Sequence, residues 1–288
     1  MSHPVMSHPV IVGVDDPQDS QATVDWAADE AHLRGLRLHL VHGWPWHGQA
    51  GSVTLADQLV RSANQEALRA LAAKAASQRP GLETTSGLVD VPAGEALVNL
   101  SAEAAVLVLG SRGTGGFPGL LVGSTSLHVT ARAACPVVVV PGASRPEGGV
   151  AVGVHGSEPC DELLAFAFEQ AQRREVPLRV VHAWSYPLIA APGHALPPVY
   201  EEGHVAAEHA RLLAEVLAGW RQKYPDVPVT EDLARSGAAK HLVEVSSTQQ
   251  LLAVGRHGHP HGPLGRLGSV SQAVVYHARC PIAVVPAA

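Results

Sequence analysis

Lysine is scarce in this sequence of 288 residues. Lysine occurs only at Lys74, Lys223 and Lys240, and none of these residues lies in a glycine-rich loop. A P-loop NTPase places a lysine on the β- and γ-phosphates of its nucleotide, and the Walker A spacing that carries this lysine is absent. The glycines within residues 113–116 also have the wrong spacing for a dinucleotide-binding fingerprint. Two common phosphate-binding motifs are therefore excluded.

Cysteine, long apolar runs and positive charge are also in short supply. The three cysteines, Cys135, Cys160 and Cys280, are too widely spaced for a disulfide framework or a zinc motif, so we expect buried thiols in a reducing cytoplasm. No apolar run approaches the eighteen or so residues that span a membrane. The N-terminus lacks a basic start and an apolar core, so we expect no secretion signal there. The formal net charge of −6 argues against general binding of nucleic acid.

A glycine pattern occurs twice in the chain. Each copy has two glycines separated by two residues and, after nine more, a Gly-Ser pair: Gly110, Gly113 and Gly123-Ser124 in the first copy, Gly255, Gly258 and Gly268-Ser269 in the second. Glycines directly after a strand let the backbone approach a ligand closely. A Gly-Ser pair that opens a helix directs backbone N–H groups at an anion. The pattern predicts two phosphate cradles of nucleotide size.

The flanking sequence is repeated as well. Residues 10–14 match 150–154 at an offset of 140 residues, whereas the glycine patterns match at an offset of 145, so the second half carries a five-residue insertion. The segment 142–149 has the composition of a linker. We expect two copies of one domain, at residues 8–142 and 149–288.

Each half alternates short apolar runs with helix-like segments. In the first half we expect strands near 10–14, 37–42, 83–89, 106–110 and 137–141, and helices near 19–34, 54–78, 93–103 and 124–133. Helical spacing would bury Val24, Ala27, Ala28 and Ala31. The apolar runs show little polar alternation, which favours strands buried on both faces of a parallel sheet. Right-handed crossovers then give a doubly wound α/β layer in each half.

Candidate ligand contacts stand where the predicted strands end. Asp15 follows the first strand, Val41 and His42 end the second, and Gly110 ends the fourth. Doubly wound sheets bind ligands beyond the carboxyl ends of their strands, at the point where the strand order reverses. We therefore predict that these residues and the glycine pattern lie together in one ligand-binding site.

At these residues the chain resembles the universal stress protein family in its tandem-domain form. The ATP-binding pattern of that family is Gly, two residues, Gly, nine residues and Gly-Ser/Thr, and both copies fit it. The resemblance covers residues 8–141 and 149–286. It implies a five-stranded parallel sheet in each half, of the adenine nucleotide α-hydrolase-like or Rossmann-like type. It also implies that the halves pair as a pseudo-dimer through strands 137–141 and 282–286.

The resemblance also implies a set of nucleotide contacts. Asp15 and Val41 would hold the adenosine, and residues 123–126 would take the phosphates through N–H and hydroxyl groups. Carried over position by position, the contacts are Gly13, Asp15, Val41, Leu109, Gly110, Arg112, Gly113, Gly123, Ser124, Thr125 and Ser126 in the first half, and Gly153, His155, Val181, Val254, Gly255, Arg256, Gly258, Gly268, Ser269, Val270 and Ser271 in the second.

The second copy departs from the pattern at His155, which stands where the first copy has Asp15. A carboxylate only accepts hydrogen bonds, whereas a neutral histidine offers one donor and one acceptor. Hydrogen bonds to charged groups contribute about 1.5–3 kcal/mol, so we expect weaker or different nucleotide binding in the second half.

Several of these residues have a second interpretation. Ser124 and Ser269 fit helix N-caps as well as phosphate ligands. Arg112 and Arg256 fit solvated loop positions as well as phosphate contacts. The alternating histidines at 257–261 fit a metal-binding loop, but no cysteine or carboxylate stands at ligand spacing, so no metal site is predicted.

The expected function is that of a cytoplasmic, ATP-binding regulatory or stress-response protein. ATP, with or without Mg²⁺, would act as a ligand. It would change the conformation of the protein or its choice of an unidentified protein partner. Association of two whole chains into a homodimer is a further possibility that the sequence does not decide. One alternative is a Mg²⁺-dependent ATPase or nucleotide-processing enzyme, for which we identify no metal-binding carboxylate. Another is an interaction scaffold without nucleotide, in which the glycines serve turns and packing.

Overall fold

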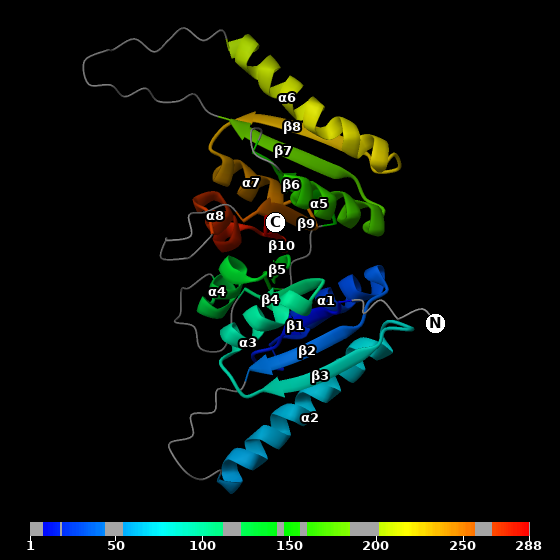
Figure 1. The fold of residues 1–288 in the computed structure, drawn as a ribbon, viewed down its shortest axis with the longest axis vertical. Coiled ribbons are helices and arrows are strands. Elements are labelled where there is room, and N and C mark those ends of the chain that lie inside the picture. The colour runs from blue at the N-terminus through cyan, green and yellow to red at the C-terminus, as the bar shows by residue number, and fades with distance from the viewer. Residues whose placement is uncertain are drawn as a thin grey trace, which may run out of the picture.

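The computed structural model describes residues 8–17, 19–43, 54–111, 122–142, 147–155, 160–184, 202–256 and 267–287. The two halves of the chain stack along the longest axis of the molecule and meet at its middle (Figure 1). The strands β2, β3 and β7 end on the same side of the molecule in this view.

The first half alternates strands and helices in the predicted order. Its elements are β1 (Val10–Gly13), α1 (Gln21–Arg34), β2 (Leu38–Gly43), α2 (Leu55–Ser77), β3 (Thr84–Val89), α3 (Ala93–Leu100), β4 (Val106–Gly110), α4 (Ser124–Arg132) and β5 (Val137–Val140). The helix expected to reach residue 103 ends at Leu100 and continues as the 3₁₀ turn Ser101–Glu103.

The second half repeats this order. Its elements are β6 (Val150–Gly153), α5 (Asp161–Arg174), β7 (Leu178–Trp184), α6 (Glu202–Lys223), β8 (Val229–Arg235), α7 (Ala238–Ser246), β9 (Leu251–Gly255), α8 (Ser269–His277) and β10 (Ile282–Val285). Among the described residues, no helix is both long enough and apolar enough to cross a membrane.

Local sequence explains where the first helix packs and ends. α1 buries completely the stripe that helical spacing predicts, namely Val24, Ala27, Ala28 and Ala31. It ends at Gly35, whose φ of 63° is left-handed, a conformation that glycine adopts without strain. The matching position after α5 is Glu175, with φ of 55°. A left-handed non-glycine residue costs about 1–2 kcal/mol, so α5 ends less favourably than α1.

All ten strands form one sheet in the order β3-β2-β1-β4-β5-β10-β9-β6-β7-β8. The strands within each half run parallel. The halves join through β5 and β10, which pair antiparallel with Val138 opposite Ala283. The predicted parallel sheets, and their pairing through the last strand of each half, are therefore confirmed.

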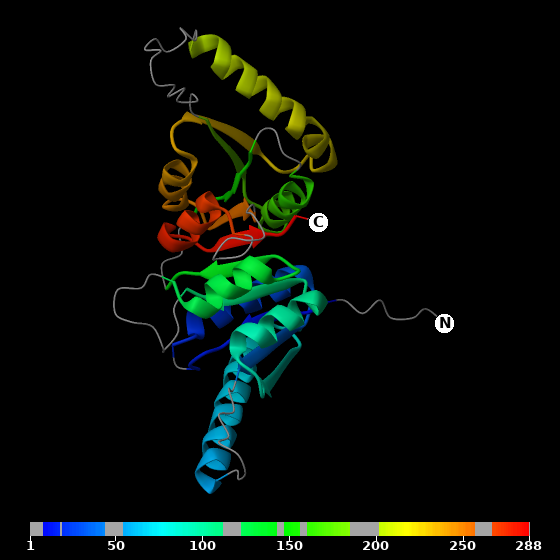
Figure 2. The ribbon, with the colours of Figure 1, turned by 60° about the vertical axis from the view of Figure 1, so that its left-hand side comes forward.

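Helices cover both faces of this sheet (Figures 1 and 2). One apolar core contains residues of α1, α2, α5 and α6, and the other contains residues of α3, α4, α7 and α8. Successive strand residues serve opposite cores: Val10 and Val12 pack into the first core and Ile11 into the second. This two-sided burial is why the strand sequences lack polar alternation.

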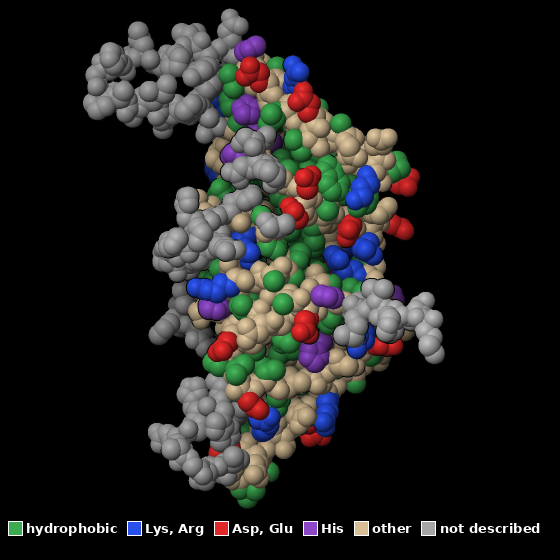
Figure 3. All heavy atoms as spheres, in the orientation of Figure 1, with side chains coloured by type: hydrophobic (Ala, Val, Ile, Leu, Met, Phe, Trp, Pro, Cys, Tyr) green, Lys and Arg blue, Asp and Glu red, His purple; other side chains and the backbone are tan. Residues whose placement is uncertain are grey.

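Acidic and basic side chains are interspersed over the face of the molecule shown in Figure 3, without a broad patch of either sign. The most exposed large apolar side chains lie early in α2, where Leu55 is 72% and Leu59 is 63% exposed. The first residue of α2 that is fully packed into the core is Leu68. The helix therefore meets the sheet only in its second half.

Candidate functional site

The carboxyl ends of β1 and β4 lie side by side where the strand order of the first half reverses. β1 pairs with β2 on one side and with β4 on the other. Along the chain, β1 is followed by β2 and β3 on one side of it, and then by β4 and β5 on its other side. Doubly wound sheets bind ligands in the crevice beyond such a point. Gly13 and Gly110 end these two strands, which places both at the crevice.

The N-terminus of α4 is fastened to the end of β4. The backbone N–H of Gly123 donates to the carbonyl of Ser111 at 2.7 Å. The hydroxyl of Ser126 donates to the carbonyl of Gly110 at 2.8 Å. Gly110 and Gly123, from opposite ends of the glycine pattern, are therefore held close together. In this arrangement the hydroxyl proton of Ser126 is used within the protein rather than offered to a phosphate.

The interpretation of Ser124 and Ser269 as helix N-caps is wrong. The N-caps are the preceding residues, Gly123 and Gly268, and both serines occupy the first helical position. No side chain in the described part of the chain caps either helix. The first N–H groups of a helix have no partner within the helix, and a glycine cap has no side chain to cover them. Within the described ranges, the first turn of α4 is therefore available to an anion, and Ser124 and Thr125 are exposed.

The apolar candidates belong to the core. The side chains of Val41, Leu109, Val181 and Val254 are at most 3% exposed and pack into the core below α3, α4, α7 and α8. A ligand could reach these four residues only through their backbone atoms. Gly13 is small for a packing reason, because a Cβ there would lie 2.7 Å from the Cδ2 of Leu109. Gly153 is restricted in the same way by a leucine side chain of α7.

Two hydrogen bonds fix the turn that carries Asp15. The N–H of Val14 donates to the carbonyl of Val41 at 2.8 Å. The Nδ1 of His42 lies 2.8 Å from the carbonyl of Val14 and donates to it, since a carbonyl only accepts. Asp15 itself is exposed at the crevice. His42 is thus a positioning residue for this turn, a role that its place at a strand end did not reveal.

The second half repeats this framework with different surface groups. The hydroxyl of Ser271 donates to the carbonyl of Gly255 at 2.7 Å, as Ser126 does in the first half. The exposed Asp15 is replaced by the exposed His155. The exposed Thr125 is replaced by the half-buried Val270, which removes a hydroxyl from the first turn of α8. The second site therefore keeps the bond from the helix serine to the strand end, exchanges a carboxylate for an imidazole, and loses one hydroxyl.

A pair of histidines also distinguishes the second site. His182, which matches His42, places Nδ1 3.2 Å from the carbonyl of Val154 and Nε2 2.9 Å from the Nδ1 of His209 on α6. The ring of His209 stacks on Trp184, with centroids 5.1 Å apart. Burial lowers the pKa of His182, the bond to Val154 opposes this, and His209 and His155 lower the pKa further. No motif in the sequence signals this pair, because its members are 27 residues apart.

The side chain of Arg256 lies at the contact between the halves. Its Nη1 donates to the carbonyl of Ala133 at 2.5 Å, and Ala133 is the C-cap of α4. One nitrogen of the guanidinium is therefore used on the first half of the chain. An arginine at a helix C-terminus satisfies an unpaired carbonyl and interacts favourably with the helix dipole.

Three site candidates, Arg112, Gly113 and Gly258, lie outside the described residues, as does the histidine run at 257–261. Within the described ranges, no group of three or more His, Cys, Asp or Glu side chains is arranged to hold a metal ion.

Comparison with known proteins assigns the family. The profile of the Universal stress protein family matches residues 6–141 and 149–286. Universal stress protein Rv2005c of Mycobacterium tuberculosis is 36% identical over 99% of both chains, and Universal stress protein Rv1996 of the same organism is 34% identical over 96% of this chain and 94% of its own. The crystal structure of a universal stress protein from Archaeoglobus fulgidus has the same fold, with a TM-score of 0.72 at 16% identity over 98% of this chain and 97% of that one. The chain therefore belongs to the universal stress protein family, with the family domain present twice.

Proposed function

We propose that the first domain, residues 8–142, binds an adenine nucleotide, with ATP as the leading candidate. The protein would then act as a nucleotide-responsive regulator that hydrolyses ATP slowly or not at all. The observation that carries this proposal is the open, glycine-capped N-terminus of α4, fastened to the end of β4 at the point where the strand order reverses.

The phosphates would lie on the first turn of α4. The uncapped N–H groups there point out of the helix and favour negative charge through the helix dipole. The exposed hydroxyls of Ser124 and Thr125 stand in the same turn and can add hydrogen bonds to phosphate oxygens. These N–H and hydroxyl groups can bind a triphosphate without the help of a lysine. The buried core side chains beneath them need not contact the phosphates.

The adenosine would lie toward Asp15. Its carboxylate accepts hydrogen bonds from a ribose hydroxyl or from the adenine amino group. The bonds from Val14 and His42 hold this turn in place before a ligand arrives, which reduces the cost of ordering on binding.

The second domain, residues 149–288, would bind nucleotide more weakly. His155 replaces a charged acceptor, and Val270 replaces a hydroxyl donor. Loss of one hydrogen bond to a charged group costs about 1.5–3 kcal/mol, which corresponds to a decrease in affinity of roughly ten- to a hundredfold.

A regulatory role is favoured over catalysis by the positions of the lysines. Lys74 donates to Gln21 at 2.8 Å, Lys223 lies over the rings of Trp220 and Tyr224, and Lys240 lies 4.0 Å from Glu244. Each lysine is thus on a helix other than α4 and α8. The phosphoryl-transfer lysine of P-loop enzymes has no counterpart at either cradle.

A calorimetric titration of the full-length protein with ATP tests the proposal. Two double exchanges at matching positions supply the variants: D15H/T125V gives the first site the groups of the second, and H155D/V270T does the reverse. We expect the first exchange to weaken the tighter binding event at least tenfold and the second to strengthen the weaker event. Absence of titratable binding in protein freed of nucleotide would contradict the proposal, as would an affinity unchanged by both exchanges.

A steady-state hydrolysis assay separates the regulator from the enzyme. We expect turnover well below 1 s⁻¹, whereas typical enzymes turn over at about 1–10³ s⁻¹. A measured value in that range would replace the regulatory proposal with an ATPase.

A further inference from the structure

A buried carboxylate joins the two domains where α1 meets α5, beside the junction of β5 and β10 (Figure 1). Glu30 of α1 is completely buried. Its Oε1 accepts from Arg34 Nε and from Gln170 Nε2, each at 2.5 Å, and its Oε2 accepts from Arg174 Nη2 at 2.7 Å. Burial raises the pKa of Glu30, but Arg174 and Arg34 outweigh this and hold the pKa below its usual value. The group is therefore ionised and shared between both domains.

The surroundings of this carboxylate are nearly symmetric. At the offset of 140 residues, Arg34 matches Arg174 and Trp26 matches Phe166. The guanidinium of Arg34 lies 5.7 Å from the ring centre of Phe166, and that of Arg174 lies 5.4 Å from the ring centre of Trp26. Each domain thus contributes one arginine and one aromatic ring to the other. The symmetry is broken at one pair, where Glu30 matches Gln170.

We propose that Glu30 and Gln170 make this interface selective for unlike domains, so that the first domain accepts the second and two like domains are rejected. The partner that fits the α1 face is one that presents an amide donor and an arginine at the positions of Gln170 and Arg174.

Two first domains would place two carboxylates in direct contact. The Nε2 of Gln170 lies 2.5 Å from the Oε1 of Glu30, and a second glutamate would put an ionised oxygen where this donor stands. No hydrogen would lie between the two oxygens, and like charges at this distance cannot both remain ionised without a large cost. The contact would need a proton or a displacement of one side chain.

Two second domains would leave two guanidinium groups without their carboxylate. Gln170 would face Gln170, and each copy of Arg174 would take the place of Arg34, which lies 4.0 Å from the 39% exposed Glu169. Both guanidinium groups would then lack the buried carboxylate that Glu30 supplies. In the cluster as it stands, Arg34 Nη2 and Arg174 Nη1 already have no hydrogen-bond partner among the described residues. A buried charge that loses its partner is strongly destabilising, so this pairing is also disfavoured. Only the unlike pair supplies one carboxylate for two arginines.

Variants of the intact chain reproduce each like pair without separating the domains. Gln170→Glu recreates the contact of two first domains, and Glu30→Gln recreates the contact of two second domains. The double variant E30Q/Q170E restores one glutamate and one glutamine with their positions exchanged. Glu103→Gln, an exposed site on the 3₁₀ turn after α3, is the control for loss of one negative charge.

Thermal unfolding of the four variants at pH 8 gives the test. We expect each single interface variant to lower the melting temperature by roughly 5–15 °C, the control by less than about 2 °C, and the double variant to recover to within about 3 °C of the parent. The proposal is overturned if the melting temperature of the double variant falls by as much as the sum of the two single decreases. It is also overturned if the double variant does not fold while the control does. A Q170E variant as stable as the parent overturns it as well, because like carboxylates would then be tolerated.

Discussion

The Nε2 of His182 accepts a hydrogen bond from the Nδ1 of His209 at 2.9 Å, which joins the end of β7 to helix α6. The direction of this bond follows from the other ring nitrogen. The Nδ1 of His182 must carry the proton because it faces the carbonyl of Val154, so Nε2 is left as an acceptor in the neutral ring. A second proton on His182 would require this bond to reverse, with the proton of His209 moved to its other ring nitrogen, and would bring positive charge into a buried position.

The second domain is therefore predicted to lose stability in mildly acidic solution. Burial lowers the pKa of His182 in the folded protein, whereas in the unfolded chain the group titrates near 6.5. As the pH falls below about 6.5, the unfolded state binds a proton that the folded state resists, and the free energy of unfolding decreases. Urea unfolding at pH 7.5 and pH 5.5 should show a smaller acid-induced loss in His182→Gln than in the parent.

The pKa values of His39 and His128 are also lowered by burial. Both residues are present in the parent and in His182→Gln, so their contribution to the acid-induced loss is the same in the two proteins. The exposed His277 supplies the control variant His277→Gln. Equal acid-induced losses in the parent and in His182→Gln would show that the histidine pair does not control the pH response.

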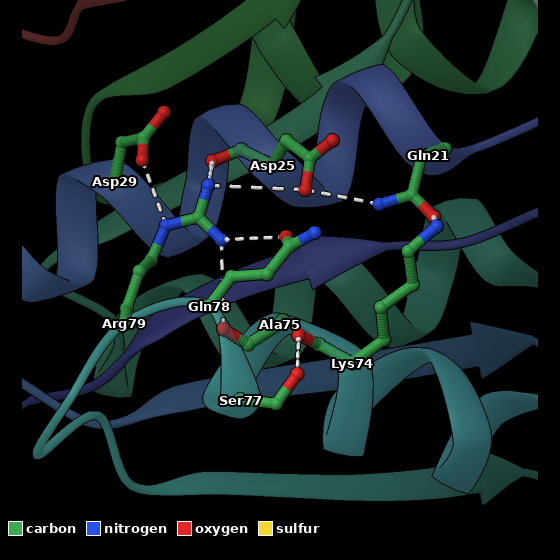
Figure 4. A network of polar contacts seen from close by, with 8 residues as sticks. All are labelled: Gln21, Asp25, Asp29, Lys74, Ala75, Ser77, Gln78 and Arg79. Carbon is green, nitrogen blue, oxygen red and sulfur yellow. Dashed lines mark hydrogen bonds and ion pairs between the residues drawn. The ribbon is translucent and has the colours of Figure 1, made fainter.

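Arg79 is predicted to be the principal polar link between α1 and the end of α2 (Figure 4). Its Nε donates to Asp29 at 2.7 Å and its Nη2 to the backbone carbonyl of Asp25 at 3.0 Å, and its side chain is only 12% exposed. The guanidinium is shielded from water, whereas the carboxylate of Asp29 is 44% exposed. Because one of the two bonds is thus partly screened, Arg79→Ala should lower the free energy of unfolding by about 1–2 kcal/mol. Denaturant titration measures this change.

Arg61, on α2, supplies a matched control. It forms an ion pair with Asp90, but its side chain is 40% exposed and that of Asp90 is 58% exposed. Exposed pairs gain little because water screens both charges, so Arg61→Ala should leave stability almost unchanged. Equal effects of the two substitutions would mean that burial does not decide the contribution of these arginines.

The thiols of Cys135 and Cys280 are predicted to be unreactive in the folded protein. Burial raises the pKa of both thiols to about 12, so neither forms thiolate near neutral pH. Cys160 is half-buried, and its pKa is also raised, by burial and by the neighbouring Asp161. Mass spectrometry after iodoacetamide treatment at pH 8 should show slow modification of one thiol, and of all three after denaturation. Rapid labelling of Cys135 or Cys280 in native protein would contradict this assignment.

The order of elements and the positions of the glycine pattern could be predicted from the sequence, because both depend on short-range periodicity. The valine-rich runs indicate strands buried on two faces, and the spacing of Gly110 and Gly123 places them at a strand end and a helix start. The N-cap was misassigned by one residue, since the sequence favours serine at a cap while the structure uses the glycine before it.

The contacts between distant elements could not be predicted. His182 of β7 meets His209 of α6, 27 residues further along the chain, and local spacing carries no record of that approach. Glu30 reaches Gln170 across 140 residues, at an interface whose existence depends on how two complete sheets join. Such pairs are decided by tertiary packing, which overrides the local preferences that a sequence displays.

Arg256 is predicted to stabilise the contact between domains rather than a bound phosphate. Its guanidinium donates to the C-cap carbonyl of α4, the helix whose other end forms the first candidate site. Arg256→Ala should therefore lower the free energy of unfolding by about 1.5–3 kcal/mol, the contribution of a hydrogen bond to a charged group. We expect the calorimetric affinity at the second site to change less than twofold, because Nη1 is bonded to Ala133 of the first half. A large loss of affinity with unchanged stability would return Arg256 to the phosphate-binding role that its position in the glycine pattern suggested.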